Sequence, residues 1–218
     1  MHNMDPVALI LLLGALALVP MMVVTMTSFL KLAIVLSMLR NALGVQQIPP
    51  NMAIYGLAMM LTLYVMAPVG SEIAGNVEKS QVSTSDVRAF VHELRVSAEP
   101  LRRFLVRNSR PEQRDFFLTT ARRMWPPQYA AGAAPDDFLI VVPAFLVSEL
   151  TAGFEIGFLL FLPFIVIDLV ISNVLMAMGM SMVSPTTITL PLKLFLFVMV
   201  DGWSRLIHGV VQLSLIHI

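Results

Sequence analysis

Charged residues are concentrated in the middle third of this 218-residue chain. Ten of the 14 Lys and Arg residues and nine of the 14 Asp and Glu residues lie between positions 71 and 137. The sequence on either side is almost continuously apolar, and the whole chain is only 13% charged, whereas soluble domains contain roughly 25% charged residues. This segregation predicts an all-α, membrane-inserted protein with two hydrophobic arms around a polar domain.

Each hydrophobic arm contains one short segment that predicts a turn. In the N-terminal arm, residues 1–70, this segment is RNALGVQQIPPN at positions 40–51, where a Gly and two adjacent Pro residues disfavour a helix. In the C-terminal arm, residues 138–218, it is SMVSPTT at positions 181–187. Each arm is therefore expected to fold into a hairpin of two long helices.

The apolar runs are too long and too irregular for simple transmembrane helices. Positions 6–39 and 138–178 comprise 34 and 41 residues, whereas a bilayer core about 30 Å thick needs roughly 20. Prolines inside the runs predict kinks or breaks. They are Pro20, Pro68, Pro143, Pro163 and Pro191.

The polar middle, residues 71–137, is expected to form a small helical domain. Apolar residues recur at helical spacing over 87–94, and Pro100 suits the first turn of a second helix. Ser109 and Glu112 match a capping box at the start of a third helix. With the N-terminus outside, two crossings by the first hairpin return the chain to the outer side of the membrane, so this domain is expected there as well.

Seven ionisable residues lie inside the apolar arms, where each costs at least about 2.5–3.5 kcal/mol in hydrocarbon. They are Lys31, Glu149, Glu155, Asp168, Lys193, Asp201 and Arg205. One interpretation is structural pairing within a protein-lined assembly, as for Asp201 and Arg205 at i,i+4. The other is a proton or ion relay. Pairing is favoured, because the three acids before position 170 share no helical face.

The segment GFEIG contributes Gly153 and Gly157 at the GxxxG spacing, which allows close approach of helices. A chance occurrence in an apolar run is the alternative interpretation. We expect these glycines to serve helix packing.

Several classes of function lack the residues they require. The chain has no cysteine, its four histidines have no metal-ligand spacing, and its formal net charge is zero. No metal, no cofactor and no nucleic acid is therefore expected. No nucleophile–base pair or phosphate loop is recognisable either, so the chain is not expected to be an enzyme.

Four methionines recur at every second position where the second long apolar run ends: Met176, Met178, Met180 and Met182. On a helix this spacing places them on two opposed sides, whereas on an extended segment it lines one face. Spacing alone leaves two interpretations open. The methionines fill the core at a helix end, or they form an exposed functional surface.

Two long segments resemble the signatures of the SctR/FliP family, the core export-apparatus proteins of type III secretion systems. The first is MTSFLKLAIVLSMLRNALGVQQIPPN, residues 26–51. The second is PAFLVSELTAGFEIGFLLFLPFIVIDLVISNVLMAMGMSMVSPTTITLPLKLFLFVMVDGW, residues 143–203. With the intervening GLAMMLTLYVMAPV, the resemblance covers both arms, and GVQQIPPNM is more similar to the virulence injectisome branch than to the flagellar one.

The resemblance implies an assembly and a role. Members form a pentamer that joins SctS-like and SctT-like subunits in a helical, right-handed export gate, through which unfolded polypeptides cross the bacterial inner membrane. An SctU-like switch protein and the secretion base rings are further implied partners, and the complex sits largely at periplasmic level. The resemblance also implies that the methionine-rich loop forms a gasket in the channel.

One alternative function remains open from the residues. A small-solute or ion transporter also uses buried carboxylates and broken helices. It predicts an inverted repeat, which the sequence does not show.

Overall fold

The structure is a computed structural model that describes residues 6–45, 48–79, 96–180 and 182–215. These residues form helices joined by turns, with no strand among them, which confirms the all-α prediction. The helices are α1 (Pro6–Met26), α2 (Phe29–Leu43), α3 (Asn51–Lys79), α5 (Glu99–Asn108), α6 (Pro111–Met124), α7 (Pro127–Ala130), α8 (Phe138–Ala177), α9 (Thr186–Met199) and α10 (Gly202–Leu215).

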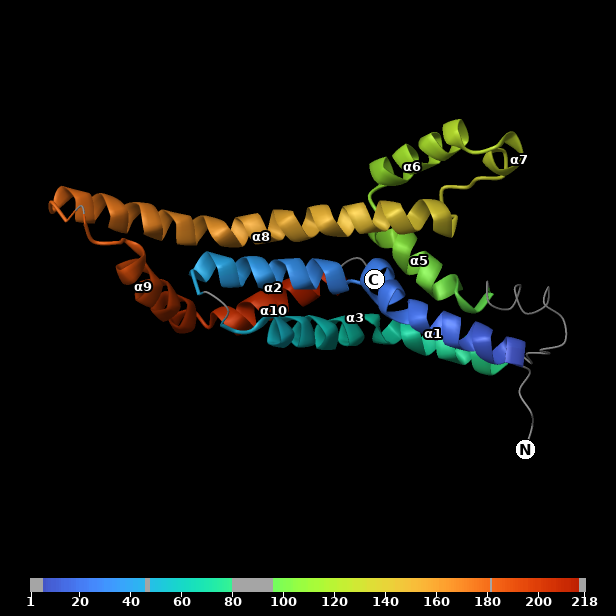
Figure 1. The fold of residues 1–218 in the computed structure, drawn as a ribbon, viewed down its shortest axis with the longest axis horizontal. Helices are drawn as coiled ribbons and strands as arrows, with labels where there is room; N and C mark the ends of the chain where they lie inside the picture. The colour runs from blue at the N-terminus through green and yellow to red at the C-terminus, as the bar shows by residue number, and fades with distance from the viewer. Residues whose placement is uncertain (1–5, 46–47, 80–95, 181, 216–218) are drawn as a thin grey trace.

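The 40-residue helix α8 runs along the long axis of the molecule (Figure 1). At 1.5 Å per residue it is about 60 Å long, twice the thickness of a bilayer core. It continues through Pro143 and Pro163 as one helix. The helices α5, α6 and α7 lie at its N-terminal end, and the connection to α9 lies at its C-terminal end (Figure 1).

Two helices, α3 and α8, are long and apolar enough to cross a membrane. Two bent pairs bring the number to four if each pair is one span: α1 with α2, bent by 63°, and α9 with α10, bent by 66°. The fold is thus that of a membrane protein with the four long apolar elements predicted from the sequence.

The two sharp bends do not occur at prolines, and the helices are not broken at the five prolines where kinks or breaks were predicted. In the first, between α1 and α2, the Thr27 hydroxyl bonds to the Val23 carbonyl and accepts a 3.3 Å hydrogen bond from the Phe29 amide. Such local side-chain bonds compete with the helical ladder. In the second, Asp201 adopts a left-handed φ of 52°, which interrupts the helix between α9 and α10.

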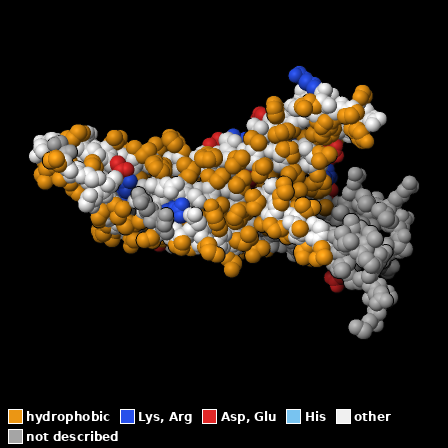
Figure 2. Space-filling model, viewed as in Figure 1, with side chains coloured by type: hydrophobic (Ala, Val, Ile, Leu, Met, Phe, Trp, Pro, Cys, Tyr) orange, Lys and Arg blue, Asp and Glu red, His pale blue; other side chains and the backbone are white. Residues whose placement is uncertain are grey.

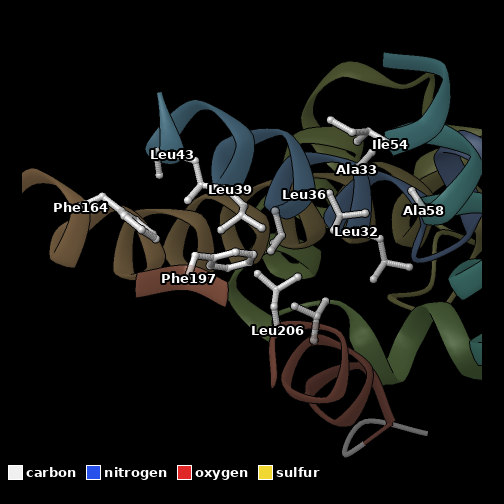
Figure 3. Packing of buried hydrophobic residues seen from close by; sticks show 13 residues of the cluster. Leu32, Ala33, Leu36, Leu39, Leu43, Ile54, Ala58, Phe164, Phe197 and Leu206 are labelled. Carbon is white, nitrogen blue, oxygen red and sulfur yellow. The ribbon is translucent and has the colours of Figure 1, made fainter. Parts of the chain in front are cut away.

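The core is centred on α2, which lies between α3 and α8 (Figure 1), and Figure 3 shows its side chains from close by. Leu32, Leu36 and Leu39 of α2 are almost fully buried. Side chains from four other helices complete this cluster, including Ile54 and Ala58 of α3, Phe164 of α8, Phe197 of α9 and Leu206 of α10. One helix thereby organises both arms of the sequence around itself.

The polar middle packs through α5 and α6 onto the first half of α8. Phe104 of α5 contacts Phe145 of α8 with ring centroids 5.6 Å apart. The predicted helices after Pro100 and Pro111 are present, whereas the helix expected at 87–94 lies outside the described residues.

The helix α3 continues to Lys79 and so crosses position 70, where the polar middle was predicted to begin. The capping box predicted at the start of α6 does not form, because the Ser109 hydroxyl donates to the Val106 carbonyl at 3.0 Å and so closes α5. Arg110 occupies the N-cap of α6 without a side-chain cap.

Candidate functional site

The first candidate region is the contact between α2 and α8. Gly153 and Gly157 are buried in it and face α2. A Cβ atom at Gly153 would lie 3.3 Å from the Ile34 Cβ, and one at Gly157 would lie 2.3 Å from the Met38 sulfur. The GxxxG glycines therefore allow the two helices to approach closely inside one chain.

A buried ion pair lies in the same contact. The Lys31 ammonium donates to the Glu149 carboxylate at 2.9 Å, and the two side chains are only 6% and 4% exposed. Glu149 precedes Gly153 by four residues, so the ion pair and the glycines occupy one face of α8. Because removing one member of a buried pair leaves an unpaired charge, this contact fixes the register of α2 against α8.

The turn between α5 and α6 is bonded to α8 by polar contacts beside this ion pair. The backbone N–H of Arg110 donates to the Ser148 hydroxyl at 2.9 Å, and the Arg110 guanidinium contacts Glu155 at 2.7 Å. A hollow of about 410 Å³ lies beneath the turn and reaches Lys31 and Glu149. Glu155 is thus paired at the surface and does not enter the buried contact.

The outer part of the polar domain carries a smaller ionic network. The Arg102 guanidinium donates to Glu99 at 2.7 Å and also contacts Asp136. The hydrogen bond from Arg102 holds the pKa of the Glu99 carboxyl below its ordinary value. The same carboxylate, together with Asp136, raises the pKa of Arg102, which is charged in any case. This network joins the start of α5 to the segment before α8.

A second buried lysine joins three helices near the other end of α8. The Lys193 ammonium on α9 donates to Asp168 of α8 at 2.6 Å and to the Ala42 carbonyl of α2 at 3.1 Å. The Lys193 side chain is 6% exposed, whereas that of Asp168 is 41% exposed. Each of these two charges therefore has an opposite charge as partner.

The predicted pair of Asp201 and Arg205 is not formed within the described part of the chain. The Asp201 carboxylate accepts a 2.9 Å hydrogen bond from the Ser204 hydroxyl, and only the backbone N–H of Arg205 bonds back to Asp201, at 3.1 Å. Asp201 lies at the bend before α10 with a left-handed φ. The Asp201 side chain thus bonds to the residue three positions on, and its carboxylate forms no ion pair with the Arg205 guanidinium.

The second candidate region is the connection between α8 and α9. Gly179, with a φ of 75°, ends α8 in a Schellman motif. Its N–H donates to the Met176 carbonyl at 3.0 Å, and the Met180 N–H donates to the Leu175 carbonyl at 2.9 Å. Glycine suits this left-handed position, so the helix ends at a defined residue.

All four predicted methionines are exposed around this cap. Their side chains are 63%, 67%, 44% and 100% exposed at Met176, Met178, Met180 and Met182. They do not fill the core of the isolated chain. The connection that carries them lies at the end of the molecule opposite the polar domain (Figure 1).

The described residues hold no group of three or more His, Asp or Glu side chains placed to bind a metal ion. Apolar side chains cover most of the face seen in Figure 2, and charged atoms form small separate groups on it. Long apolar helices, buried lysine–carboxylate pairs and an exposed apolar surface define an all-α membrane protein.

Comparison with known proteins places the chain within that class. A model of the FliP family matches residues 12–210. The chain is 53% identical to Yop proteins translocation protein R of Yersinia pestis over 207 residues, which are 95% of each chain. It is 51% identical to harpin secretion protein HrpW of Pseudomonas syringae pv. syringae over 201 residues, 92% of this chain and 97% of the relative.

A third relative, virulence protein YscR of Salmonella typhimurium, is 45% identical over 208 residues, 95% of this chain and 96% of the relative. The chain belongs to the FliP family. This confirms the resemblance drawn from the two sequence segments, and the names of these relatives refer to translocation, secretion and virulence, as the injectisome branch predicts.

Sequence reasoning identified the seven charges, the glycines and the methionines, but it missed three polar contacts. These are the bond from Arg110 to Ser148, the bond from Lys193 to Ala42 and the network around Arg102. Each of the first two involves a backbone group, the donating N–H of Arg110 in one and the accepting carbonyl of Ala42 in the other. Only the interspersed acids and arginines of the polar domain offered a signal, and they do not specify partners.

Proposed function

We propose that the chain is a core subunit of a type III secretion export gate in the bacterial inner membrane. Its family membership and the secretion-related names of its relatives support this role. In the gate, the chain surrounds a path for unfolded polypeptides and has no catalytic task. The observation that carries the proposal furthest is the exposed methionine loop on a capped helix end.

The exposed surface of the chain supports assembly with other proteins. The isolated chain exposes 14551 Å², whereas a compact monomer of this mass exposes about 10,000 Å². Large apolar side chains account for much of it, such as Met52, Leu139 and Val198, each more than 70% exposed. In the proposal these surfaces pack in a helical, right-handed arrangement of about five copies, together with SctS-like and SctT-like subunits.

The methionine loop acts as the seal of that gate. A path for polypeptides has to close against ions and still admit side chains of every size. Methionine is apolar and unbranched, and it fills irregular gaps and moves aside more readily than branched residues. The Schellman cap at Gly179 holds the base of the loop while the side chains of Met178 and Met182 stay free to adapt.

Replacing all four loop methionines with alanine tests the seal. The variant is expected to assemble normally, to keep at least part of its protein export, and to let ions or small dyes leak across the inner membrane. Two double variants refine the test. The first combines Met178→Ala with Met182→Ala in the loop. The control combines Met52→Ala with Met124→Ala, at two methionines outside the loop that are also highly exposed. Only the loop double should leak. A quadruple variant that assembles and stays as tight as wild type would refute the seal.

The proposal also orients the chain, with residues 71–137 on the periplasmic side and the assembled complex largely at periplasmic level. The chain has no cysteine, so a single Gln128→Cys in the exposed part of α7 gives a clean reporter. A membrane-impermeant maleimide should label it in intact spheroplasts. Labelling that requires lysis would place this domain in the cytoplasm.

The transporter alternative has less support. Each of the three carboxylates on α8 has its own basic partner: Glu149 with Lys31, Glu155 with Arg110, and Asp168 with Lys193. A relay requires groups that exchange protons along a line. These three ion pairs instead join α8 to three different elements: α2, the turn before α6, and α9.

A further inference from the structure

The C-terminal half of α8 carries a row of large apolar side chains that the described part of the chain leaves exposed. The row recurs at intervals of three and four residues, so it follows one face of the helix. Its members, which together we call the α8 ridge, are between 41% and 66% exposed: Leu159, Leu162, Val166, Leu169 and Val170. Gly157 and Phe164, which contact α2 or its cluster, lie on the other side of α8. The ridge therefore faces away from the core of its own chain.

A hollow of about 470 Å³ opens beside the middle of α8. Its lining includes Leu30, Ile34 and Met38 of α2, together with Tyr55 of α3 and Phe154 of α8. We call it the Tyr55 groove. Tyr55 and Phe154 are 48% and 56% exposed, so the groove is accessible from outside the chain. At 100° per residue, Phe154 lies about 100° around α8 from the middle of the ridge. The ridge and the groove are thus two different faces of the molecule.

The exposed apolar surface is longer than one bilayer core. On α8 it includes Leu139, 74% exposed, and Val174, 48% exposed. These positions are about 50 Å apart at 1.5 Å per residue, whereas the hydrocarbon core is about 30 Å thick. Between them, α3 packs beside the first half of α8 through Val69 and presents Met60 and Tyr64, 69% and 68% exposed. Lipid alone cannot cover all of this surface, so part of it requires protein.

A second copy of the chain supplies both halves of a contact, because each copy has one ridge and one groove. If the ridge of one copy occupies the groove of the next, the second copy keeps its own ridge free for a third. Such a head-to-tail contact continues into a ring or a helical row. The exposed area exceeds that of a compact monomer by about 4,500 Å², whereas a standard interface covers about 800 Å² of each partner. The surplus is large enough for two such faces on every copy.

We propose that the α8 ridge of one copy packs into the Tyr55 groove of the neighbouring copy. The inference deepens the proposed function, on which it rests for the existence of an assembly of copies. It assigns the contact to the outward face of α8 on one copy and to α2, α3 and Phe154 on the other. The contact is a property of the assembled chains and can be measured whether or not protein is exported.

Disulfide formation in the assembled complex tests the contact. The chain has no cysteine, so Tyr55→Cys is combined in one chain with Leu162→Cys, Val166→Cys or Leu169→Cys, one at a time. Val166 lies 12 positions beyond Phe154, about 18 Å along α8, whereas a disulfide requires Cα atoms within about 7 Å. A disulfide between Tyr55→Cys and Val166→Cys therefore joins two chains. Mild oxidation of membranes followed by non-reducing electrophoresis should give dimers, trimers and larger products of this chain.

Tyr64→Cys is the matched control for the groove. Tyr64 has the same side chain as Tyr55, is at least as exposed, and lies nine positions further along α3, on the opposite side of that helix. Combined with the same ridge cysteines, it should give no products larger than a dimer. Each single-cysteine variant should stay monomeric after oxidation, because the ridge of one copy does not meet the ridge of another.

Several results would overturn the inference. Dimers from Val166→Cys alone would show that two ridges meet, and larger products only with Tyr64→Cys would move the contact to the other side of α3. If all three Tyr55 pairs stay monomeric in the assembled complex, lipid or another subunit covers the ridge. Export by the cysteine-free wild type separates this inference from the proposed function. A ladder in a complex that exports nothing upholds the contact and refutes the export role, whereas export without a ladder does the reverse.

Discussion

The two ends of α8 are held differently. Its N-terminal half is held by a buried ion pair, two glycine contacts and the bonds of Arg110. Its C-terminal end carries an exposed loop, and Lys193 of the following helix bonds to the Ala42 carbonyl of α2. In the first region, polar groups are enclosed and their partners are specific. In the second, apolar side chains face outward and the backbone bonds stay local. One helix thus combines a rigid attachment with an adaptable end, and the two can be tested separately.

The largest effect is expected at the rigid end, from Lys31→Met. It leaves Glu149 buried without its cation, and breaking one side of a buried pair costs about 3–5 kcal/mol. The variant should unfold at markedly lower temperature in detergent and should accumulate poorly. The double variant Lys31→Met with Glu149→Leu should recover much of the loss, because an apolar replacement of the whole pair is often neutral. Equal stability of the single variant and wild type would contradict this.

A somewhat smaller effect is expected from Gly157→Ala. Its new methyl group meets the Met38 sulfur, which lies 2.3 Å from the ideal Cβ position. Overpacking of this kind costs about 1–3 kcal/mol. Gly153→Ala, whose nearest contact is 3.3 Å, should cost less. Adding Met38→Ala should relieve Gly157→Ala in the same unfolding measurement, and a double variant no better than the single one would reject the contact.

Ser148→Ala should have a local effect that is confined to the rigid end of α8. It removes the acceptor of the Arg110 N–H, a bond worth about 0.5–1.5 kcal/mol. Amide exchange should become faster in the α5–α6 turn and remain unchanged around Met178. If amide exchange in the α5–α6 turn is the same in the variant as in wild type, the turn is held by other contacts.

The smallest effect concerns pH and the outer network. Because Arg102 lowers the pKa of Glu99 in the folded chain, this contact stabilises the fold above the ordinary carboxyl pKa of 4.5. The contribution is lost as the pH falls through the lower, folded value. The protection of amides near the start of α5, measured relative to their intrinsic exchange rates, should therefore fall below that value and should depend less on pH in Glu99→Gln. A pH response that is identical in the variant would assign it to other groups.

The sequence predicted what depends on local pattern. The two hydrophobic arms, the turn near Gly44 and the helix after Pro111 follow from composition and spacing over a few residues. The methionine loop was recognised because its spacing and its place after a long apolar run are visible without a fold.

The remaining features depend on residues far apart in the chain. Lys31 and Glu149 are 118 positions apart, and Lys193 and Ala42 are 151 apart. No spacing rule links such positions, and a backbone acceptor leaves no signal in the sequence. The two sharp bends are local, but they do not follow from proline content. They depend on the hydrogen bonds of Thr27 and on the left-handed backbone of Asp201.

The exposed sulfur atoms of the loop also tie its polarity to oxidation. Peroxide converts an accessible thioether into a sulfoxide, a polar group that reductases convert back. Met182 is fully exposed in the isolated chain, so its sulfur is open to this reaction before subunits cover it. A sulfoxide there would hold water where the proposed seal requires a dry surface. The redox chemistry of the compartment thus bears on how tightly such a loop closes.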